Sequence, residues 1–357
     1  MNLFAECSME KEKKKEYRKI AGMLAGILLL LTAAGALLAG GAKNRKSTAV
    51  EPTHEEKIAA VNADNGTKPF TVLLAGCDRA SGLTDVLMLV RLDGAGGCTV
   101  LQIPRDTYAA YTDAAYRKLN GAARSLGGMA QLRDFLAGAF GVKIDRYARL
   151  NLDALRHIVD AMGGVELELP MALDYEDPEQ GLTIHLPAGW QRLNGEAAEQ
   201  FVRFRSGYVR GDIGRMDAQK LFLAAVFRRF RGELSLGEVT SLVSVTLENL
   251  ETDLTLTEAM TLANAGRRVQ AKDIRMLTLP GSDAVAHASG ASYYVLSSAS
   301  VSEVLRQYFD GGEFDPGRVF CNPAYDDFCK IYEGYVPYIV YDAEKIVENG
   351  IQIAATH

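Results

Sequence analysis

The feature that most constrains this chain is an apolar run from Ile20 to Ala42 that contains no charged residue. About 20 apolar residues in helical form are enough to cross the hydrocarbon core of a bilayer. A secretory signal peptide is the alternative, but its apolar core is shorter, about 7–15 residues. We therefore predict a single uncleaved transmembrane helix over residues 20–42.

Basic residues are distributed unequally around this run. Six precede it and three follow it closely: Lys11, Lys13, Lys14, Lys15, Arg18 and Lys19 before, and Lys43, Arg45 and Lys46 after. Loops that stay in the cytoplasm carry the excess of Lys and Arg. We expect residues 1–19 to form a cytoplasmic tail and residues 43–68 an extracytoplasmic stalk, with the rest of the chain outside the cell membrane.

The composition is that of a folded globular protein, with 48% apolar and 24% charged residues. The formal net charge is -6 at pH 7, whereas a domain that binds duplex nucleic acid carries a basic surplus. Nucleic acid is therefore not an expected partner.

Four of the five cysteines follow the apolar run and would face an oxidising space. Cys321 and Cys329 could close a short loop, whereas Cys77 and Cys98 lie in apolar runs that are typical of buried thiols. No pattern of cysteine and histidine indicates zinc, so any metal is expected to have oxygen ligands.

Apolar patterns predict a single α/β domain with a mixed sheet over residues 69–312. Strands are predicted over 70–78, 86–92, 98–104, 165–170 and 274–281, and helices over 129–141, 152–164, 212–230 and 297–309, with two further helical stretches between 239 and 266. Residues 313–357 contain three prolines and two cysteines and are predicted to form a C-terminal extension.

Charged residues gather where the first predicted strands end. Asp78 ends the first strand, Asp85 precedes the second, and Arg105 and Asp106 follow the third. Neighbouring side chains of an extended chain point to opposite faces, so Arg105 and Asp106 are expected to contact other groups rather than each other. Three carboxylates at one edge need a compensating cation, and oxygen ligands favour Mg²⁺. Solvent-exposed acids at strand ends are the alternative.

A second charged group lies further along the chain. Arg203 and Arg205 flank one aromatic residue, so an extended chain would send both guanidinium groups to one face. Asp212 can cap a helix that carries Arg215 and Gln219 one turn apart. Guanidinium groups near a helix N-terminus bind phosphate oxygens well. A solvated basic face is the alternative.

Five motifs, taken in order, resemble those of the LytR-CpsA-Psr family of cell-envelope proteins. They are LLAGCD with TDVLMLVRL and TVLQIPRDTY, then KLNGAA, IDRYARLN, VDAMGGVELELP, and LNGEAAEQFVRFR with GDIGRMDAQ. The match runs from about residue 70 to 230 and continues more weakly to about 312. One such motif would be weak evidence, but five in order behind an N-terminal anchor are specific.

The resemblance implies a membrane-anchored, outward-facing phosphotransferase. Such an enzyme moves a glycopolymer, for example teichoic acid or capsular polysaccharide, from an undecaprenyl pyrophosphate carrier to peptidoglycan. The implied fold has three layers, with helices on both faces of a mixed central sheet and an apolar cavity for the polyprenyl chain. The implied cofactor is Mg²⁺, with Mn²⁺ as an alternative.

The same resemblance implies roles for individual residues. Asp78 and Asp85 would hold Mg²⁺ on the pyrophosphate. The phosphate oxygens would be bound by Arg105, Lys118, Arg203, Arg205, Arg215 and Gln219. Arg105, Asp106 and Asp78 would be catalytic, with Asp106 or Asp78 accepting the proton of the attacking hydroxyl group. Asp212 would cap its helix beside them.

The chain departs from the family pattern at Leu83 and Ala218, where basic residues are usual. We expect an active enzyme with an altered substrate preference. Two other functions are compatible with the residues: binding or hydrolysis of polyprenyl pyrophosphates without transfer, and transcriptional attenuation. The acidic net charge and the lack of a helix-turn-helix pattern in the short inner tail disfavour attenuation.

Overall fold

The structure, a computed structural model, describes residues 68–77, 83–109, 118–177, 182–208, 210–232, 250–286, 290–312, 328–331 and 339–349, and the single residues 242, 246 and 314. The predicted transmembrane run 20–42, Asp78 and Cys321 lie outside the described residues. Within the described ranges no helix combines the length and the apolar character needed to span a membrane.

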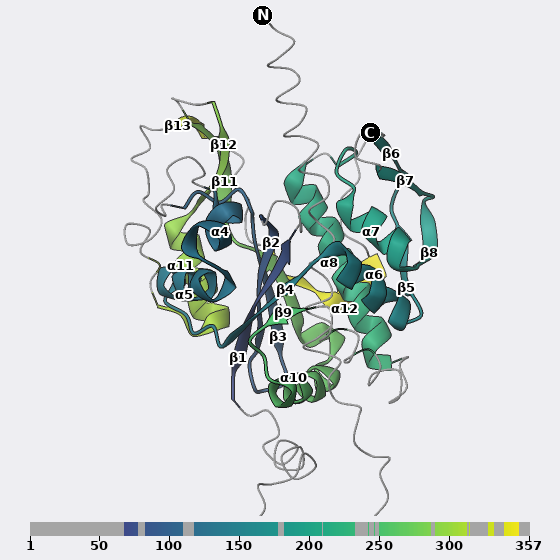
Figure 1. Cartoon of the computed structure of the whole chain (residues 1–357), viewed down its shortest axis with the longest axis horizontal. Helices are drawn as coiled ribbons and strands as arrows, with labels where there is room; N and C mark the ends of the chain where they lie inside the picture. The colour runs from purple at the N-terminus through teal and green to yellow at the C-terminus, as the bar shows by residue number, and fades with distance from the viewer. Residues whose placement is uncertain are drawn as a thin grey trace, which may run out of the picture.

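A mixed sheet of seven strands forms the centre of the molecule (Figure 1). Its order is β14-β10-β3-β2-β1-β4-β9, with β1 at Phe70–Cys77, β2 at Thr84–Leu92, β3 at Cys98–Ile103, β4 at Arg146–Leu150, β9 at Glu251–Thr252, β10 at Ile274–Thr278 and β14 at Tyr341–Asp342. Strands β1, β2 and β3 are antiparallel neighbours, whereas β4 is parallel to β1 and β10 is parallel to β3. The predicted mixed sheet is confirmed, and the first three predicted strands form its middle.

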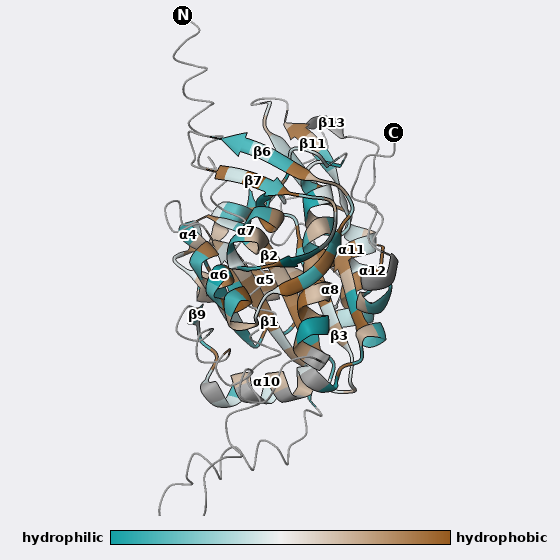
Figure 2. Ribbon diagram, turned by 90° about the vertical axis from the view of Figure 1, so that its right-hand side faces the viewer, coloured by the Kyte–Doolittle hydropathy of each residue, from teal (hydrophilic) through white to brown (hydrophobic). Residues whose placement is uncertain are grey.

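Helices cover both faces of this sheet, which explains why its central strands are apolar on both sides. Leu73 of β1 packs into one layer and Leu74 into the other, as the twofold periodicity of a strand requires. One layer contains α4 (Ala122–Leu126), α5 (Met129–Phe140) and α11 (Ser298–Phe309), and the other contains α6 (Leu152–Ala161), α7 (Gly195–Arg203) and α8 (Asp212–Gly232). Figure 2 shows the hydrophobic residues concentrated in the central strands and the helix faces that cover them.

Local sequence explains where these helices begin and end. The side-chain oxygens of Asn151 and Asn194 accept hydrogen bonds from backbone N–H groups in the first turns of α6 and α7. Gly141 ends α5 with φ at 60°, a conformation that costs little only for glycine. Thr255 and Glu258 form a capping box at the start of α10 (Leu256–Arg268), near the lower end of the sheet in Figure 1.

Several short strands lie outside the central sheet. Strand β5 (Val165–Leu169) pairs with β8 (Gly189–Leu193), and β6 (Leu173–Asp177) pairs with β7 (Leu182–Leu186). A three-stranded sheet contains β11 (Gly281–Ala286), β12 (Ser292–Leu296) and β13 (Phe328–Ile331). Of these strands only β5 was predicted. The predicted strand 274–281 ends at Thr278, and the chain then enters β11.

The C-terminal region does not stand apart from the domain. Strand β14 pairs with β10 at one edge of the central sheet. The helix α12 (Ala343–Asn349) packs against α8, and Ala343 and Ile346 belong to the hydrophobic core. Within the predicted C-terminal extension, residues 341–349 therefore close the sheet edge and bury apolar side chains.

Candidate functional site

A tight turn after β3 places Arg105 and Asp106. Thr107 closes this turn, because its backbone N–H and its hydroxyl group both donate to the carbonyl oxygen of Pro104, at 3.1 and 2.6 Å. Arg105 Nη1 donates to Asp85 Oδ1 of β2 at 2.8 Å, and both side chains are buried. The turn therefore brings a guanidinium group from β3 to a carboxylate from the neighbouring strand.

Arg105 and Asp106 contact different partners, as predicted from their neighbouring positions in the sequence. Asp106 Oδ1 lies 2.8 Å from Lys118 Nζ, whereas Asp106 Oδ2 is 3.8 Å from Arg105 Nε, at the outer limit of an ion pair. Lys118 reaches this position because its backbone pairs with Tyr108 in an isolated β-bridge. The turn after β3 and the segment before α4 thus share one charged cluster.

The N-terminus of α8 adds the predicted arginines from a distant part of the sequence. Asp212 is the first residue of α8, and its Oδ1 lies 2.6 Å from Arg215 Nη2. The same oxygen is 3.9 Å from Arg205 Nε and 3.9 Å from Arg105 Nε. Three guanidinium groups therefore converge on one carboxylate. Asp212 acts here as their shared counter-charge, in addition to its position at the helix N-terminus.

The pKa values in this cluster reflect burial and crowded charge. Burial alone would raise the pKa of Asp212, but the positive charges of Arg215, Arg105 and Arg205 outweigh it and hold that pKa below its ordinary value. Burial lowers the pKa of Arg215 to about 10, against the opposing effect of Asp212. The surrounding arginines therefore keep the Asp212 carboxylate ionised. Burial, in contrast, disfavours the charged form of the Arg215 guanidinium group.

Some buried hydrogen-bond donors in the described part of this region have no acceptor. Within the described ranges, Arg215 Nε and Nη1 and Gln219 Nε2 have no hydrogen-bond partner, although both residues are 1% exposed. Arg215 and Gln219 lie one turn apart on α8, as predicted. Unpaired buried donors are rare because each one costs free energy. The arrangement can accept an oxyanion that supplies the missing acceptors.

Arg203 is placed differently from the prediction. The chain at this point is helical and not extended, because Arg203 is the last residue of α7. Arg203 Nη1 donates to Glu199 Oε1 at 2.7 Å, one helical turn earlier, and Glu199 also pairs with Arg156 of α6. The expectation that Arg203 and Arg205 leave the same face of an extended chain is therefore wrong: Glu199 holds Arg203, whereas Arg205 faces Asp212.

Sequence reasoning missed two acidic residues of this region. Glu199 is buried and lies between two arginines, but in the sequence it looks like one more polar residue of an amphipathic helix. Asp283 of β11 is close enough to Asp212 and Asp106 that burial and their negative charges raise its pKa. The short segment that contains Asp283 has no pattern that marks a site.

The residues that could hold a metal are only partly described. Asp78 lies outside the described residues, and Asp85 is already bonded to Arg105. Across the described ranges no group of three or more His, Cys, Asp or Glu side chains is arranged to hold a metal ion. Cys77 and Cys98 are both buried, as predicted, and burial raises the pKa of Cys98 to about 12.

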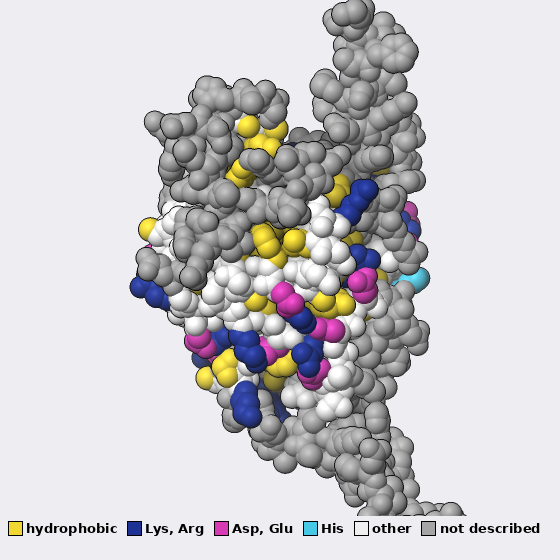
Figure 3. All heavy atoms as spheres, turned by 60° about the vertical axis from the view of Figure 1, so that its left-hand side comes forward, with side chains coloured by type: hydrophobic (Ala, Val, Ile, Leu, Met, Phe, Trp, Pro, Cys, Tyr) yellow, Lys and Arg dark blue, Asp and Glu magenta, His cyan; other side chains and the backbone are white. Residues whose placement is uncertain are grey.

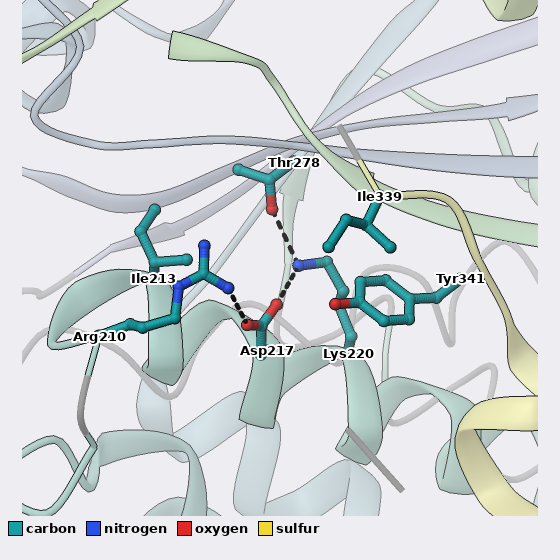
Figure 4. Close-up of a pocket in the computed structure, with 7 residues that line it drawn as sticks. All are labelled: Arg210, Ile213, Asp217, Lys220, Thr278, Ile339 and Tyr341. Atoms are coloured by element: carbon teal, nitrogen blue, oxygen red, sulfur yellow. Dashed lines mark hydrogen bonds and ion pairs between the residues drawn. The ribbon is translucent and has the colours of Figure 1, made fainter. Parts of the chain in front are cut away.

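Another face of α8 lines a small pocket that contains none of the predicted site residues. Lys220 Nζ lies 2.7 Å from Asp217 Oδ1 and 2.8 Å from Thr278 Oγ1 of β10, as Figure 4 shows. Arg210 reaches the same aspartate at 3.4 Å, and Tyr341 of β14 lies beside Lys220. The pair between Asp217 and Lys220 is buried and joins α8 to the sheet.

Charge on the visible surface is mixed in sign. Figure 3 shows basic and acidic side chains interspersed on one face of the molecule. Ion pairs among the described residues include Arg133 with Asp253 and Arg146 with Glu258. A protein that binds duplex nucleic acid would gather its basic residues on one surface. The described surface in this view does not have that pattern.

The fold and the site define a class: a three-layer α/β protein with a buried, arginine-rich charge cluster at the ends of its central strands. The chain belongs to the LytR_cpsA_psr family, whose model matches residues 37–310. The resemblance seen in the motifs is thereby confirmed. Ala218, where the motif usually has a basic residue, is fully buried in the apolar core.

Known relatives agree with this assignment. The chain is 27% identical over 263 residues to the polyisoprenyl-teichoic acid–peptidoglycan teichoic acid transferase TagV of Bacillus subtilis, covering 71% of this chain and 67% of the relative. It is 23% identical to TagU of the same organism over 314 residues, covering 84% and 98%.

Solved structures show the same fold. The crystal structure of B. subtilis TagV matches with a TM-score of 0.59 and 27% identity, over 68% of this chain and 96% of that one. A structure described as TagT bound to LIIa-WTA matches with a TM-score of 0.55 and 25% identity, over 68% and 90%. The mixed α/β architecture is therefore shared with these proteins.

Proposed function

We propose that this protein transfers a glycopolymer from an undecaprenyl pyrophosphate carrier to peptidoglycan. The observation that carries the proposal is the group of buried donors on α8: Arg215 and Gln219 keep unpaired N–H groups next to a cluster of three guanidinium groups. A pyrophosphate supplies the oxygens that these donors lack, and guanidinium groups bind such oxygens in forked geometry. Family membership and the named transferase relatives point to the same chemistry.

The proposed reaction is an in-line displacement at phosphorus. The acceptor hydroxyl oxygen of peptidoglycan forms a bond to the phosphorus that carries the glycopolymer. The bond from that phosphorus to the bridging oxygen breaks, and the carrier leaves as undecaprenyl monophosphate. Arg105 and Arg215 stabilise the negative charge that develops on the oxygens. Asp106 or Asp78 accepts the hydroxyl proton, and Lys118 holds the Asp106 carboxylate at 2.8 Å.

The donor atoms are compatible with Mg²⁺, or Mn²⁺ in its place, bound together with the substrate. Mg²⁺ commonly takes only one or two protein carboxylates and completes its shell with substrate phosphates and water. Asp85 is a buried carboxylate beside Arg105, and we propose it, with Asp78, as the protein contribution. When bound, the ion neutralises pyrophosphate charge.

We propose that the polyprenyl chain lies in the apolar layer between the central sheet and the helices α6, α7 and α8. That layer is the larger hydrophobic cluster of the described residues, and Arg203 and Arg215 extend from two of its helices. We further propose that residues 20–42 anchor the protein in the cell membrane with the domain outside. Their charge-free sequence and the basic residues before them support this orientation.

Transfer of a lipid-linked teichoic acid precursor to peptidoglycan by the purified full-length chain tests the proposal. Arg215→Lys keeps a positive charge but removes the forked donors, and Asp85→Asn removes a carboxylate. We expect either variant to lower transfer by about a hundredfold or more, as the loss of a transition-state contact does. Arg149→Ala is the matched control, because Arg149 pairs with Glu251 on the surface and exposed pairs contribute little.

The products distinguish the alternatives. Release of undecaprenyl monophosphate without polymer on the peptidoglycan would identify a pyrophosphatase. Binding of the carrier without either product would identify a binding protein. Full transfer by Arg215→Lys and Asp85→Asn would show that the site is elsewhere.

A further inference from the structure

The antiparallel pair of strands β5 and β8 exposes the only tryptophan of the chain. Trp190 is 58% exposed, the largest exposed fraction among the described large hydrophobic residues. The register of the strand pair causes this exposure: Leu167, Leu169 and Leu193 point into the core, so the alternate residues must face solvent. The position is therefore part of a well-defined strand pair and not a consequence of a loose loop.

The surroundings hold the indole ring in place. The guanidinium carbon of Arg228, from α8, lies 5.6 Å from the ring centroid, within the range of a cation–π contact. Arg228 is itself fixed, because its Nη2 donates to the backbone oxygen of Glu166 at 2.7 Å. Arg192 pairs with the Glu166 carboxylate at 2.6 Å. One face of the indole is thus supported while much of the ring remains open to solvent.

Polar groups of both signs surround the exposed ring. Glu168 lies directly opposite Trp190 in the register of the β5–β8 strand pair, and Glu166 lies opposite Arg192. Carboxylates accept hydrogen bonds from hydroxyl groups, whereas guanidinium groups donate to carbonyl oxygens. A rigid aromatic surface with acceptors and donors at its edge fits a sugar ring, which has an apolar C–H face and hydroxyl groups at its rim.

We propose that this surface, the Trp190 platform (Glu166, Glu168, Trp190, Arg192 and Arg228), binds the glycan strand of peptidoglycan by stacking a pyranose ring on the indole. The proposal rests on the proposed function, which makes peptidoglycan the acceptor. The platform has two carboxylates and two guanidinium groups and therefore no surplus positive charge to attract a phosphate-rich polymer, whereas the exposed carboxylate of Glu168 can accept hydrogen bonds from sugar hydroxyl groups. The N-acetylated sugars of the strand offer hydroxyl and amide groups instead.

The platform is rigidly joined to the oxyanion site. Helix α8 carries both Arg215 of the oxyanion site and Arg228 of the platform. At 1.5 Å per residue, these two positions are about 20 Å apart along the same helix. A second contact on a long strand raises the local concentration of its hydroxyl groups at the first site.

The single tryptophan is also the probe. We would titrate the full-length chain, in a detergent without a sugar headgroup, with a linear N-acetylglucosamine oligosaccharide and follow its tryptophan emission. We expect a saturable change. Calorimetry with the same oligosaccharide should show affinity reduced at least about tenfold in Trp190→Ala and within about threefold of the parent in Trp190→Tyr, which keeps an aromatic face. Ile339→Ala, at another exposed apolar residue, should bind normally.

Each outcome decides the proposal. No saturable change with the oligosaccharide, or unchanged affinity in Trp190→Ala, would reject the platform. Tighter binding of purified teichoic acid than of the oligosaccharide at physiological salt would also reject it. Asp85→Asn should still bind the oligosaccharide. A parent chain that binds the oligosaccharide but does not transfer the polymer rejects the proposed function alone, whereas a parent chain that transfers the polymer but does not bind the oligosaccharide rejects the platform alone.

Discussion

At the scale of single residues, Glu199 is the buried acid that positions Arg203. Its carboxylate is bonded to Arg203 of α7 and to Arg156 of α6. Glu199→Gln keeps the shape but removes the charge, which leaves a buried guanidinium without its counter-charge. Removing one partner of a buried pair costs about 3–5 kcal/mol, and we expect the free energy of unfolding in urea to fall by this order.

The same variant should lower glycopolymer transfer about tenfold or more if Arg203 binds phosphate as proposed, because Glu199 no longer holds its guanidinium group in place. Glu196→Gln is the control on the same helix, since Glu196 is exposed in the first turn. If both variants unfold at the same urea concentration and transfer equally well, Glu199 has no positioning role.

His185 is a residue whose protonation should be linked to folding. Its Nδ1 lies 3.0 Å from Asp174 and its Nε2 lies 3.2 Å from Glu176, across the β6–β7 hairpin. These two hydrogen bonds raise the pKa of His185 above its ordinary value of 6.5. The stabilisation is therefore fully present below about pH 6.5 and is lost as the pH rises through the higher pKa of the folded state.

An NMR titration of the His185 ring measures this directly. We expect a pKa above 6.5 in the parent chain, and a return toward 6.5 when Asp174→Asn and Glu176→Gln are combined. A parent value at or below 6.5 would show that the two carboxylates do not hold the imidazolium.

At the scale of elements, α8 places a buried ion pair against the sheet. Asp217 and Lys220 are both less than 5% exposed, and burial lowers the pKa of Lys220 despite the nearby aspartate. Asp217→Ala leaves the lysine charge buried and should cost about 3–5 kcal/mol in urea unfolding. Replacing the pair by Asp217→Leu and Lys220→Met should restore most of that loss, because apolar side chains avoid the desolvation cost. A double variant less stable than Asp217→Ala would contradict this account.

The elements differ in how far the sequence predicts them. Long apolar runs such as β1, and helices with a regular apolar face and a terminal glycine such as Gly141, were predicted correctly because one local signal decides them. The hairpin β6–β7 was not predicted, because each of its strands is only five residues long and the acidic residues of β6 interrupt the apolar pattern. Strand β14 was missed because two residues carry no pattern, and only pairing with β10 makes them a strand.

The candidate site shows the same division. Motifs in order identified the residues Asp85, Arg105, Lys118, Arg205, Asp212 and Arg215, which the structure brings into one connected charge cluster. No local signal identified Glu199 or Asp283, because the sequence does not show which buried side chains an acidic residue contacts in the fold. The roles of the predicted residues in catalysis stay predictions that the transfer assay tests.

At the scale of the whole molecule, the C-terminal segment closes the fold that carries the site. Strand β14 covers the edge of β10, and α12 packs on α8, which carries Arg215 and Gln219. Ile346 of α12 is 1% exposed. Truncating such a residue to alanine costs about 2–5 kcal/mol, and in a domain of this size each kcal/mol lowers Tm by about 2–4 °C.

Ile346→Ala should therefore lower Tm by roughly 4 °C or more, whereas Lys345→Ala, at the exposed neighbouring residue, should leave it unchanged. Arg215 is held by Asp212 at the N-terminus of α8, and within the described ranges no hydrogen bond or ion pair joins it to α12. The affinity for inorganic pyrophosphate, measured by calorimetry well below Tm, should therefore stay within about twofold in Ile346→Ala. A large loss of pyrophosphate affinity with the fold intact would show that the sheet edge controls the site. An unchanged Tm would show that α12 contributes nothing to the domain, and its packing on α8 would then need another explanation.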